Sequence, residues 1–433
     1  MHRSLHRFLL PIAAVVLLVS TGCATNPATG RSQLNLYSEA QEIQIGQQAD
    51  PQIVAQHGLY DDPELARYVD RIGQGLAANS ERPGLPWTFR VLDDPVVNAF
   101  ALPGGYIYVT RGILAHMNSE AELAAVLGHE IGHVTGQHGV NRMSKAQFAQ
   151  IGIGVGAILA PDVARQVGGL AQTGMQLLFL QYGRDDEREA DALGFRYADR
   201  GGYPPGAFVD MFAMLGASGR VAGQARLPTY LTTHPHPEER QRTAQQRVDQ
   251  APPEVRDRPY RRGPFLDRID GIPFGPDPDQ GFFVGRAFVH PDLRLRIELP
   301  DGWTGYNQRD AVIAMSPEKN AMIQLTLADE PTVDAAARAF YSQEGLNVEQ
   351  SWRDDSRGMA LQATRLFSAG QGTGKIFGAA GFVEDSGRVY RLLALAQPAA
   401  WRKSSNTMEA SLESLGALRD RRYLDLDPMR VEL

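Results

Sequence analysis

The spacing of apolar residues divides the chain into a helix-rich first half and a strand-rich second half. In the first half, capping signals at Ser38, Asp62 and Ser119 mark three helix starts. Apolar residues at helical spacing follow the last two, which predicts helices that are buried along one side. Two β-rich runs, at 88–92 and 106–110, predict short strands between these helices.

The second half shows a different pattern. Residues 293–299 alternate strictly between apolar and polar, which predicts a strand with one solvated face. Further strands are expected at 312–315, 322–327, 360–367, 375–383 and 389–396, and helices at 333–344 and 404–418. Many strands with few helices favour an α+β domain with an antiparallel sheet. Residues 251–280 are rich in Pro, Gly, Arg and Asp, which suits a linker or a strap over the first domain.

The first 22 residues have the organisation of a signal peptide, with a basic start, a short apolar run and small residues at the end. Cys23 follows directly and is the only cysteine, so an intrachain disulfide is impossible. This position resembles a bacterial lipoprotein signal, in which Cys23 becomes the lipidated first residue and Ala24 directs sorting to the outer membrane. A secreted protein with an incidental cysteine is the alternative.

A His-Glu-x-x-His segment lies on the third predicted helix. Residues four apart share a helix face, so His129 and His133 can bind one metal ion. Glu130 lies beside them, within reach of a metal-bound water. Two nitrogen ligands and a carboxylate general base are the arrangement of zinc proteases. A chance match on a buried helix is the alternative.

An acidic run follows at 184–191. Glu187 and Asp191 are four residues apart and share a helix face, so Glu187 can supply a third zinc ligand. Asp191 can then hydrogen-bond a ligand histidine and fix its tautomer. We expect Glu189 to point elsewhere and lie at the surface. Without the upstream motif, the run would be interpreted as a solvated face.

Two further segments border the predicted site. Prolines stiffen the loop around His234, which precedes a helix containing Arg240, and both side chains could assist the metal site. Upstream, the strand formed by Tyr106, Ile107, Tyr108 and Val109 could hold a substrate peptide if its edge is exposed. An ordinary internal strand is the alternative.

Residues 149–182 are apolar and rich in glycine, with a Pro-Asp break in the middle. They predict two helices, either as a hairpin in the core or as a mobile cover over the site. The whole chain of 433 residues is long enough for two domains, and its net charge of −7 argues against nucleic-acid binding.

Taken together, these motifs resemble the M48 family of zinc metallopeptidases, in particular its periplasmic lipoprotein and chaperone-like members in Gram-negative bacteria. The resemblance covers residues 26–250. It implies one Zn²⁺ per chain, held by His129, His133 and Glu187, with Glu130 as the catalytic base. It also implies that His234 approaches the metal or stabilises the reacting carbonyl oxygen with Arg240. In some relatives a histidine at this place occupies the fourth coordination position and keeps the resting enzyme latent.

We therefore predict an α+β protein, with a mainly helical zincin metalloprotease domain that carries a small sheet and a C-terminal α+β domain with an antiparallel sheet. The predicted ranges are a signal peptide at 1–22, a tether at 23–37, the protease domain at 38–250, a linker at 251–285, the second domain at 286–420 and a tail at 421–433. The second domain is similar to PsbP-like and Mog1-like domains. It has no histidine or cysteine beyond His290, so we expect a binding module rather than a second metal site.

The predicted function is a zinc endopeptidase of the periplasm, anchored to the outer membrane at Cys23. By resemblance, its substrates are unfolded or misfolded envelope proteins, and the second domain could bind envelope assembly machinery. The alternative is a chaperone-like binding lipoprotein in which proteolysis is latent or secondary. A structural lipoprotein would neither bind zinc nor cleave.

Overall fold

The computed structural model describes residues 23–146, 182–221, 229–235, 237–351, 360–369, 375–424 and 426–433. The chain forms two compact units, Met1–Gly275 together with Arg430–Leu433, and Pro276–Met429. The predicted signal peptide and all but the last residue of the helix pair predicted at 149–182 lie outside the described residues. Where the chain is described, no helix combines the length and apolar character needed to cross a bilayer.

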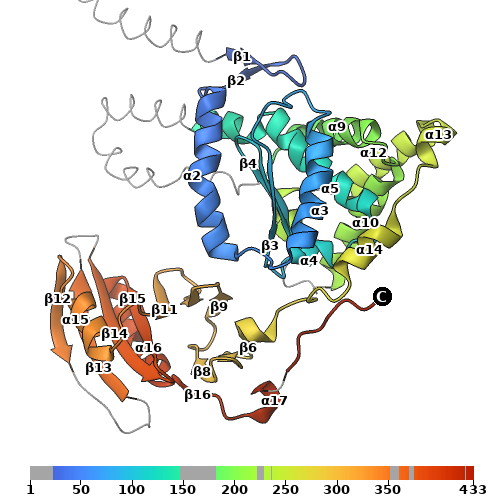
Figure 1. Cartoon of the computed structure of the whole chain (residues 1–433). Coiled ribbons are helices and arrows are strands. Elements are labelled where there is room, and N and C mark those ends of the chain that lie inside the picture. The colour runs from blue at the N-terminus through green and yellow to red at the C-terminus, as the bar shows by residue number, and fades with distance from the viewer. Residues whose placement is uncertain are drawn as a thin grey trace, which may run out of the picture. The chain divides into compact units, whose positions relative to one another are not determined.

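The first unit contains most of the helices (Figure 1). Its elements are β1 (Cys23–Thr25), β2 (Ser32–Leu34), α2 (Glu39–His57), α3 (Pro63–Ala77), β3 (Thr88–Leu92), β4 (Ala99–Leu102), β5 (Tyr106–Thr110), α4 (Arg111–Leu114), α5 (Glu120–Thr135), α9 (Arg184–Arg200), α10 (Gly206–Val221), α11 (Thr229–Thr233), α12 (Pro237–Gln250), α13 (Pro253–Arg256) and α14 (Arg262–Ile269).

The three helix starts expected from the sequence are found. Ser38 and Gln41 form a reciprocal capping box at the start of α2. Asp62 caps α3 by accepting bonds from two backbone amides of the first turn. Ser119 caps α5 by accepting from the Glu122 amide. Each cap satisfies amides that have no partner inside the helix.

A three-stranded sheet, ordered β3-β5-β4, forms the middle layer of the first unit. Alternate β5 residues face opposite layers, since Ile107 and Val109 join the core around α3 and α5, whereas Tyr106 and Tyr108 join a second core with α2. Figure 1 shows α2 and α3 on either side of this sheet. The α5 helix is buried along its entire length.

The sheet order corrects one prediction. The strand Tyr106–Val109 is central, paired in parallel with β3 and antiparallel with β4. Its backbone groups are already bonded on both sides, so no peptide can be added to it. The two edges belong to β3 and β4, and of these β4 packs beside α5. Sequence pattern identifies strands, but the order of strands in a sheet is a long-range property that the pattern does not carry.

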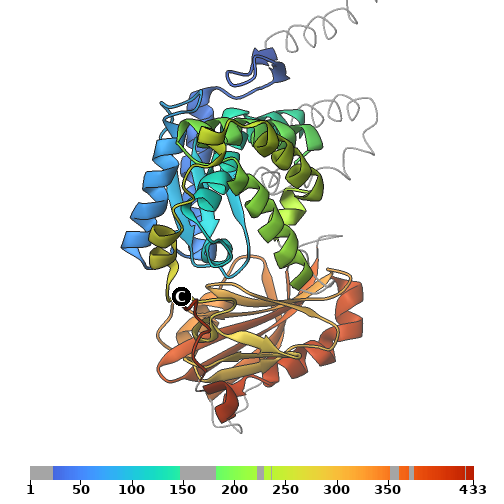
Figure 2. The same cartoon turned by 90° about the vertical axis from the view of Figure 1, so that its right-hand side faces the viewer.

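Glycines allow α5 and α9 to pack closely. A Cβ on Gly132 would lie 2.7 Å from the Ala190 carbonyl oxygen, and one on Gly194 would lie 2.9 Å from the His129 amide nitrogen. These helices therefore touch backbone to backbone, and α10 packs beside them on α5. In Figure 2 the green helices that follow residue 182 gather on one side of the first unit. The close packing brings the start of α9 to the His-Glu-x-x-His face.

The segment after Cys23 differs from the predicted tether at 23–37. It forms an antiparallel hairpin, with Cys23 paired to Leu34. Asn26 is 1 % exposed, and its side-chain amide donates a 2.7 Å bond to the carbonyl of Gly136 at the end of α5. The polar composition was interpreted as solvated chain, but here polar side chains satisfy backbone groups of the fold.

The predicted linker at 251–285 also differs from the structure. Residues up to Gly275 belong to the first unit, where Phe265 and Ile269 of α14 are buried in the core. The fully buried Arg111 guanidinium donates to the carbonyls of Pro273 and Gly275. The predicted tail is divided as well, because the last four residues return to the first unit. Phe265 and Ile269, one turn apart on α14, thus attach this segment to the core of the first unit, although its composition is that of a linker.

The second unit contains two sheets and two longer helices. Its elements are η2 (Pro278–Gln280), β6 (Phe282–Val284), β7 (Ala287–His290), β8 (Leu295–Glu298), β9 (Thr304–Asn307), β10 (Ala311–Met315), β11 (Ala321–Leu327), α15 (Val333–Tyr341), β12 (Leu346–Ser351), β13 (Ala360–Ala369), β14 (Ile376–Asp385), β15 (Arg388–Ala396), α16 (Pro398–Glu413), β16 (Gly416–Ala417) and α17 (Arg421–Leu424).

The larger sheet of this unit has the order β12-β13-β14-β15-β11-β10-β9, and its pairs are antiparallel. One face packs on α15 around Phe340 and Phe382. The other face packs on α16 and on the four-stranded sheet β16-β8-β7-β6 around Phe288 and Met408. The α+β architecture predicted for the chain is confirmed, with an antiparallel sheet in the second unit.

Candidate metal centre

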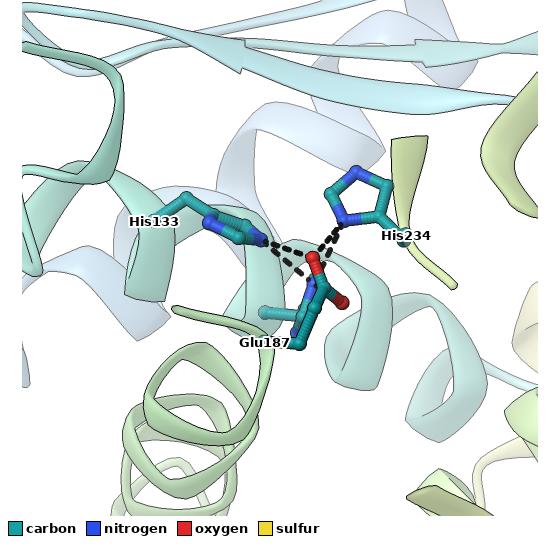
Figure 3. A group of neighbouring side chains, drawn as sticks. His133, Glu187 and His234 are labelled. Atoms are coloured by element: carbon teal, nitrogen blue, oxygen red, sulfur yellow. Dashed lines mark hydrogen bonds and ion pairs between the residues drawn. The ribbon is translucent and has the colours of Figure 1, made fainter. Parts of the chain in front are cut away.

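Four buried side chains from three parts of the first unit converge on one point. His129 and His133 come from α5, Glu187 from the first turn of α9, and His234 from the residue after α11. One ligand atom from each lies within 4.8 Å of the others. Figure 3 shows His133, Glu187 and His234 pointing toward one another. The structure thus brings together the three predicted ligands and adds His234 as a fourth.

The distances suit a tetrahedral ion. The two α5 imidazoles approach through their Nε2 atoms at 3.0 Å, and His234 Nδ1 lies 3.3 Å from His129 Nε2. Glu187 Oε1 lies 2.9 Å from His234 Nδ1 and 3.5 Å from His133 Nε2. Ligands about 2.0–2.1 Å from a tetrahedral Zn²⁺ are separated by roughly 3.4 Å. The observed distances bracket that value.

The electrostatics of the cluster favour the protonation states that a cation needs. Burial lowers the pKa of His133 well below its usual value, so its imidazole is neutral. Burial by itself raises the pKa of the Glu187 carboxyl, but the charge of Arg240 and the contacts with His234 and His133 hold it well below its usual value. Neutral imidazole with an ionised carboxylate is the state in which these groups bind metals.

Glu130 lies beside this cluster, and both of its oxygens lack a hydrogen-bond partner among the described residues although its side chain is 0 % exposed. His234 Nε2 lies 3.7 Å from Glu130 Oε1. Burial raises the pKa of this carboxyl. A buried carboxylate without a partner is costly unless something polar meets it, which fits a metal and its water beside it.

Asp191 and Arg240 support the ligands from behind. Asp191 Oδ1 lies 2.9 Å from His129 Nδ1, which fixes the tautomer that presents Nε2 to an ion. Arg240 donates from Nε and Nη2 to Asp191 and places Nη1 2.7 Å from Glu187 Oε2. The predicted role of Asp191 therefore has the required geometry. The predicted oxyanion role of Arg240 stays a prediction, because its observed contacts in the cluster are with these two carboxylates and with the His129 ring.

Three aromatic contacts were absent from the sequence-based prediction. The ring of Tyr182 stacks on His133 with a centroid distance of 3.9 Å. Tyr230 stacks on His234 at 4.4 Å, one turn earlier on α11. His138, five residues beyond the second motif histidine, touches His133. Tyr182 and Tyr230 have no spacing signature in sequence, but a third histidine shortly after His-Glu-x-x-His was a signal that could have been used.

A small cavity, open to solvent, is lined by residues of the edge strand and by the metal-cluster residue His133. Its lining includes Leu102 and Pro103 at the end of β4, and His133, Val140 and Tyr182 on the opposite side. An unpaired strand edge next to the metal ligands offers backbone groups to an extended chain. The strand for which the sequence predicts this role, Tyr106–Val109, has no free edge.

The comparisons with known proteins agree with this geometry. The profile described as Peptidase family M48 matches residues 63–248, a range that contains all four candidate ligands. Residues 63–248 therefore form a domain that is similar to the M48 peptidases. The zinc metallopeptidase resemblance seen in the sequence is thereby confirmed, and zinc is the cofactor that the M48 domain and its ligand set call for.

Curated relatives cover the same part of the chain. A putative beta-barrel assembly-enhancing protease of Vibrio cholerae is 33% identical over 202 residues, which cover 45% of this chain and 41% of the relative. The mitochondrial metalloendopeptidase OMA1 of Arabidopsis thaliana is 33% identical over 178 residues, covering 41% of this chain and 35% of the relative. The chain thus spans about half or less of the length of these relatives, and the similarity centres on the M48 domain.

Among solved structures, the cyanobacterial PsbP protein of Synechocystis covers 31% of this chain and 95% of its own length, at 11% identity and a TM-score of 0.27. A TM-score this low carries no argument. The similarity of the second unit to PsbP-like and Mog1-like domains therefore stays a prediction.

Proposed function

We propose that this protein is a zinc-dependent endopeptidase that acts on proteins of the bacterial envelope from the periplasmic side. The observation that carries the proposal is Glu130, a fully buried carboxylate that has no hydrogen-bond partner among the described residues and lies beside four convergent ligands. A structural zinc site does not require a buried carboxylate of this kind beside the ligands. A hydrolytic site needs one, because water must lose a proton as it attacks an amide carbon.

In this proposal, His129, His133 and Glu187 hold the ion. Bound Zn²⁺ supplies Lewis-acid polarisation of the scissile carbonyl and makes water more acidic. Glu130 accepts the proton of the attacking water on Oε1 or Oε2 and later delivers it to the leaving amine. Its raised pKa suits both transfers, since burial makes the carboxyl a stronger base than an exposed glutamate.

The substrate would lie as an extended strand along β4. Backbone groups of Ala99–Leu102 on the side away from β5 can pair with it. Because this pairing uses main-chain atoms, it accepts many sequences, and selectivity would come from side chains that enter the cavity between Leu102 and Tyr182. Unfolded segments meet this requirement, whereas folded proteins do not offer an extended chain.

His234 suggests that the resting enzyme is closed. Its Nδ1 occupies a ligand position, so four protein side chains surround the point where an ion would lie. Catalytic zinc sites keep one position open for water or substrate. We propose that His234 withdraws when substrate binds and that its imidazole, or Arg240, then stabilises the carbonyl oxygen.

The location and substrates are proposed from the sequence and from the relatives. The signal-peptide pattern and the single Cys23 favour export and lipid anchoring at the outer membrane, and the name of the Vibrio relative refers to assembly of β-barrel proteins. Misfolded or stalled envelope proteins are therefore the proposed substrates. Labelling cells with a clickable fatty acid tests the anchor, since the wild type should be labelled and Cys23→Ala should not.

A second candidate is a chaperone-like lipoprotein whose proteolysis is latent or secondary. The arrangement of four ligand residues supports this candidate, because a metal ion held by four side chains has no open position for water or substrate. The decisive experiment compares the wild type with Glu130→Gln for zinc content and cleavage of casein. The endopeptidase predicts full zinc in both proteins and chelator-sensitive cleavage in the wild type alone. Zinc binding without cleavage, even after His234→Ala, would favour the chaperone-like protein instead.

The second unit is proposed to bind substrates or envelope assembly machinery. Because Glu130→Gln should retain bound substrate, crosslinking and pull-down with that variant would identify proteins held by the M48 domain. Repeating it without Pro276–Met429 would show which partners depend on the second unit.

A further inference from the structure

The backbone turns sharply just after α5, and this turn carries His138 back toward the metal cluster. Gln137 adopts a left-handed conformation with φ of 55°, which costs energy for a residue other than glycine. At Gly136, a Cβ atom would lie 2.6 Å from His138 Nε2. The turn therefore requires both a strained residue, Gln137, and a glycine, Gly136. Together they place the imidazole of His138. His138 is 6 % exposed.

The turn is held by the N-terminal segment. The side-chain amide of Gln137 donates to Glu42 and its oxygen accepts from Gln33. Asn26 binds the Gly136 carbonyl. Three contacts from outside the helix thus fix two consecutive residues. Strain that is maintained by this many partners calls for a functional explanation.

His138 contacts the second motif histidine on the side away from the metal. The Nδ1 atoms of His133 and His138 lie 2.9 Å apart, and the two rings are nearly perpendicular. One of these nitrogens must carry the proton and the other must accept it. Because His133 Nε2 faces the cluster and has to be unprotonated to bind an ion, His133 Nδ1 is the donor. His138 Nδ1 is therefore the acceptor.

This assignment fixes the remaining proton. Neutral His138 carries its hydrogen on Nε2, and this atom lies 3.3 Å from Glu189 Oε1. The Glu189 side chain is 17 % exposed, so it is not the free surface residue expected from the sequence. A carboxylate, an imidazole and the ligand imidazole thus form one directed chain. His129 has the simpler arrangement, in which Asp191 contacts its Nδ1 directly.

We propose that His138, oriented by Glu189, is a positioning residue that holds His133 in its Nδ1-protonated tautomer and thereby strengthens zinc binding. The inference rests on the zinc centre proposed above. It uses no catalytic step, so it can be tested by metal affinity alone. Partners of this kind change zinc affinity by roughly 10- to 100-fold when removed.

The experiment measures the zinc dissociation constant by chelator competition for the wild type, His138→Ala and His138→Asn. The Asn side chain places an oxygen near the position of Nδ1, so it restores an acceptor for the His133 proton. We expect His138→Ala to weaken zinc binding by roughly 10- to 100-fold and His138→Asn to recover most of that loss. His57→Ala is the matched control, because His57 also pairs with a carboxylate, Asp94, but lies outside the cluster.

Two further measurements separate positioning from a general loss of structure. Thermal unfolding of the metal-free variants should show similar stability for His138→Ala and His138→Asn. The ¹⁵N spectrum of metal-free, histidine-labelled protein should show the His133 proton on Nδ1 in the wild type. Zinc affinity that is unchanged in His138→Ala, or equally weak in His138→Asn, would overturn the proposal. A His133 proton on Nε2 in the metal-free wild type would also overturn it.

Discussion

His234 Nδ1 lies 2.9 Å from Glu187 Oε1, close enough for both atoms to bind the same ion. This contact joins the residue after α11 to the first turn of α9, two segments separated in the sequence by 47 positions. It is reinforced by the hydrogen bond from the Tyr182 amide to the Thr233 carbonyl, at 3.0 Å. His234 therefore fills the fourth ligand position. The residue before it, Thr233, is bonded to Tyr182, which lies just before α9.

Replacing His234 should release this position. We expect His234→Ala to retain zinc, since His129, His133 and Glu187 remain, and to cleave casein severalfold faster than the wild type because an open position is available. The initial rate of casein hydrolysis with a zinc assay checks this. A slower rate would assign His234 to transition-state stabilisation, and an unchanged rate would exclude it from the site.

We expect replacement of Arg240 to lower the stability of the protein, whether or not Arg240 takes part in the reaction. Its guanidinium is buried between Glu187 and Asp191, so Arg240→Ala removes the cationic partner of two buried carboxylates. Breaking a buried pair in this way costs about 3–5 kcal/mol. Denaturant unfolding of the metal-free protein should show the loss, and saturating zinc should reduce it. Normal stability together with lost turnover would instead favour the oxyanion role.

The close packing of α5 and α9 predicts a strong effect of one methyl group. In Gly132→Ala the new Cβ would lie 2.7 Å from the Ala190 carbonyl oxygen, so α9 must shift. Overpacking costs about 1–3 kcal/mol, and the shift should also weaken zinc binding because Glu187 moves with α9. Gly75→Ala in α3 is the matched control, since no atom lies within 4 Å of its added Cβ. That change should stabilise the protein by up to about 1 kcal/mol.

Acid should destabilise the first unit through Glu120. Burial by itself raises the pKa of this carboxyl, but hydrogen bonds from Arg261, Tyr68 and Tyr203 lower the pKa below the ordinary 4.5. A lowered folded-state pKa gives stability that is present above pH 4.5 and is lost as the pH falls through the folded-state value. Glu120→Gln should therefore be less stable than the wild type at pH 7, and the difference should shrink below pH 4.5. Thermal unfolding at several pH values measures it.

The metal ligands on α5 were predictable because a single helix determines their geometry. His129 and His133 are four residues apart, and no information beyond the helical repeat is needed to place them together. Glu187 could be proposed as a ligand only together with the upstream His-Glu-x-x-His motif, and the order of motifs that resembles a known family strengthened this prediction. Its approach depends on Gly132 and Gly194, whose role is visible only once the two helices are packed.

Other features could not be predicted because they depend on contacts between distant segments. The order of β4 and β5 in the sheet decides which strand can bind substrate, and alternation within each strand is the same in either order. The hairpin after Cys23 is polar in sequence, and its burial follows from the Gly136 carbonyl that Asn26 satisfies. His138 depends on a left-handed residue between two elements, which no periodicity describes.

The bond from Asn26 to the Gly136 carbonyl also limits how far the first unit can lie from Cys23. Only two residues lie between Cys23 and Asn26, and the extended chain from one to the other covers roughly 10 Å. If Cys23 carries the lipid, the chain between the lipid and the catalytic unit is very short. The catalytic unit would then be held directly at the bilayer surface. Polypeptides that linger at that surface would be cleaved, while those that diffuse freely through the compartment would be spared.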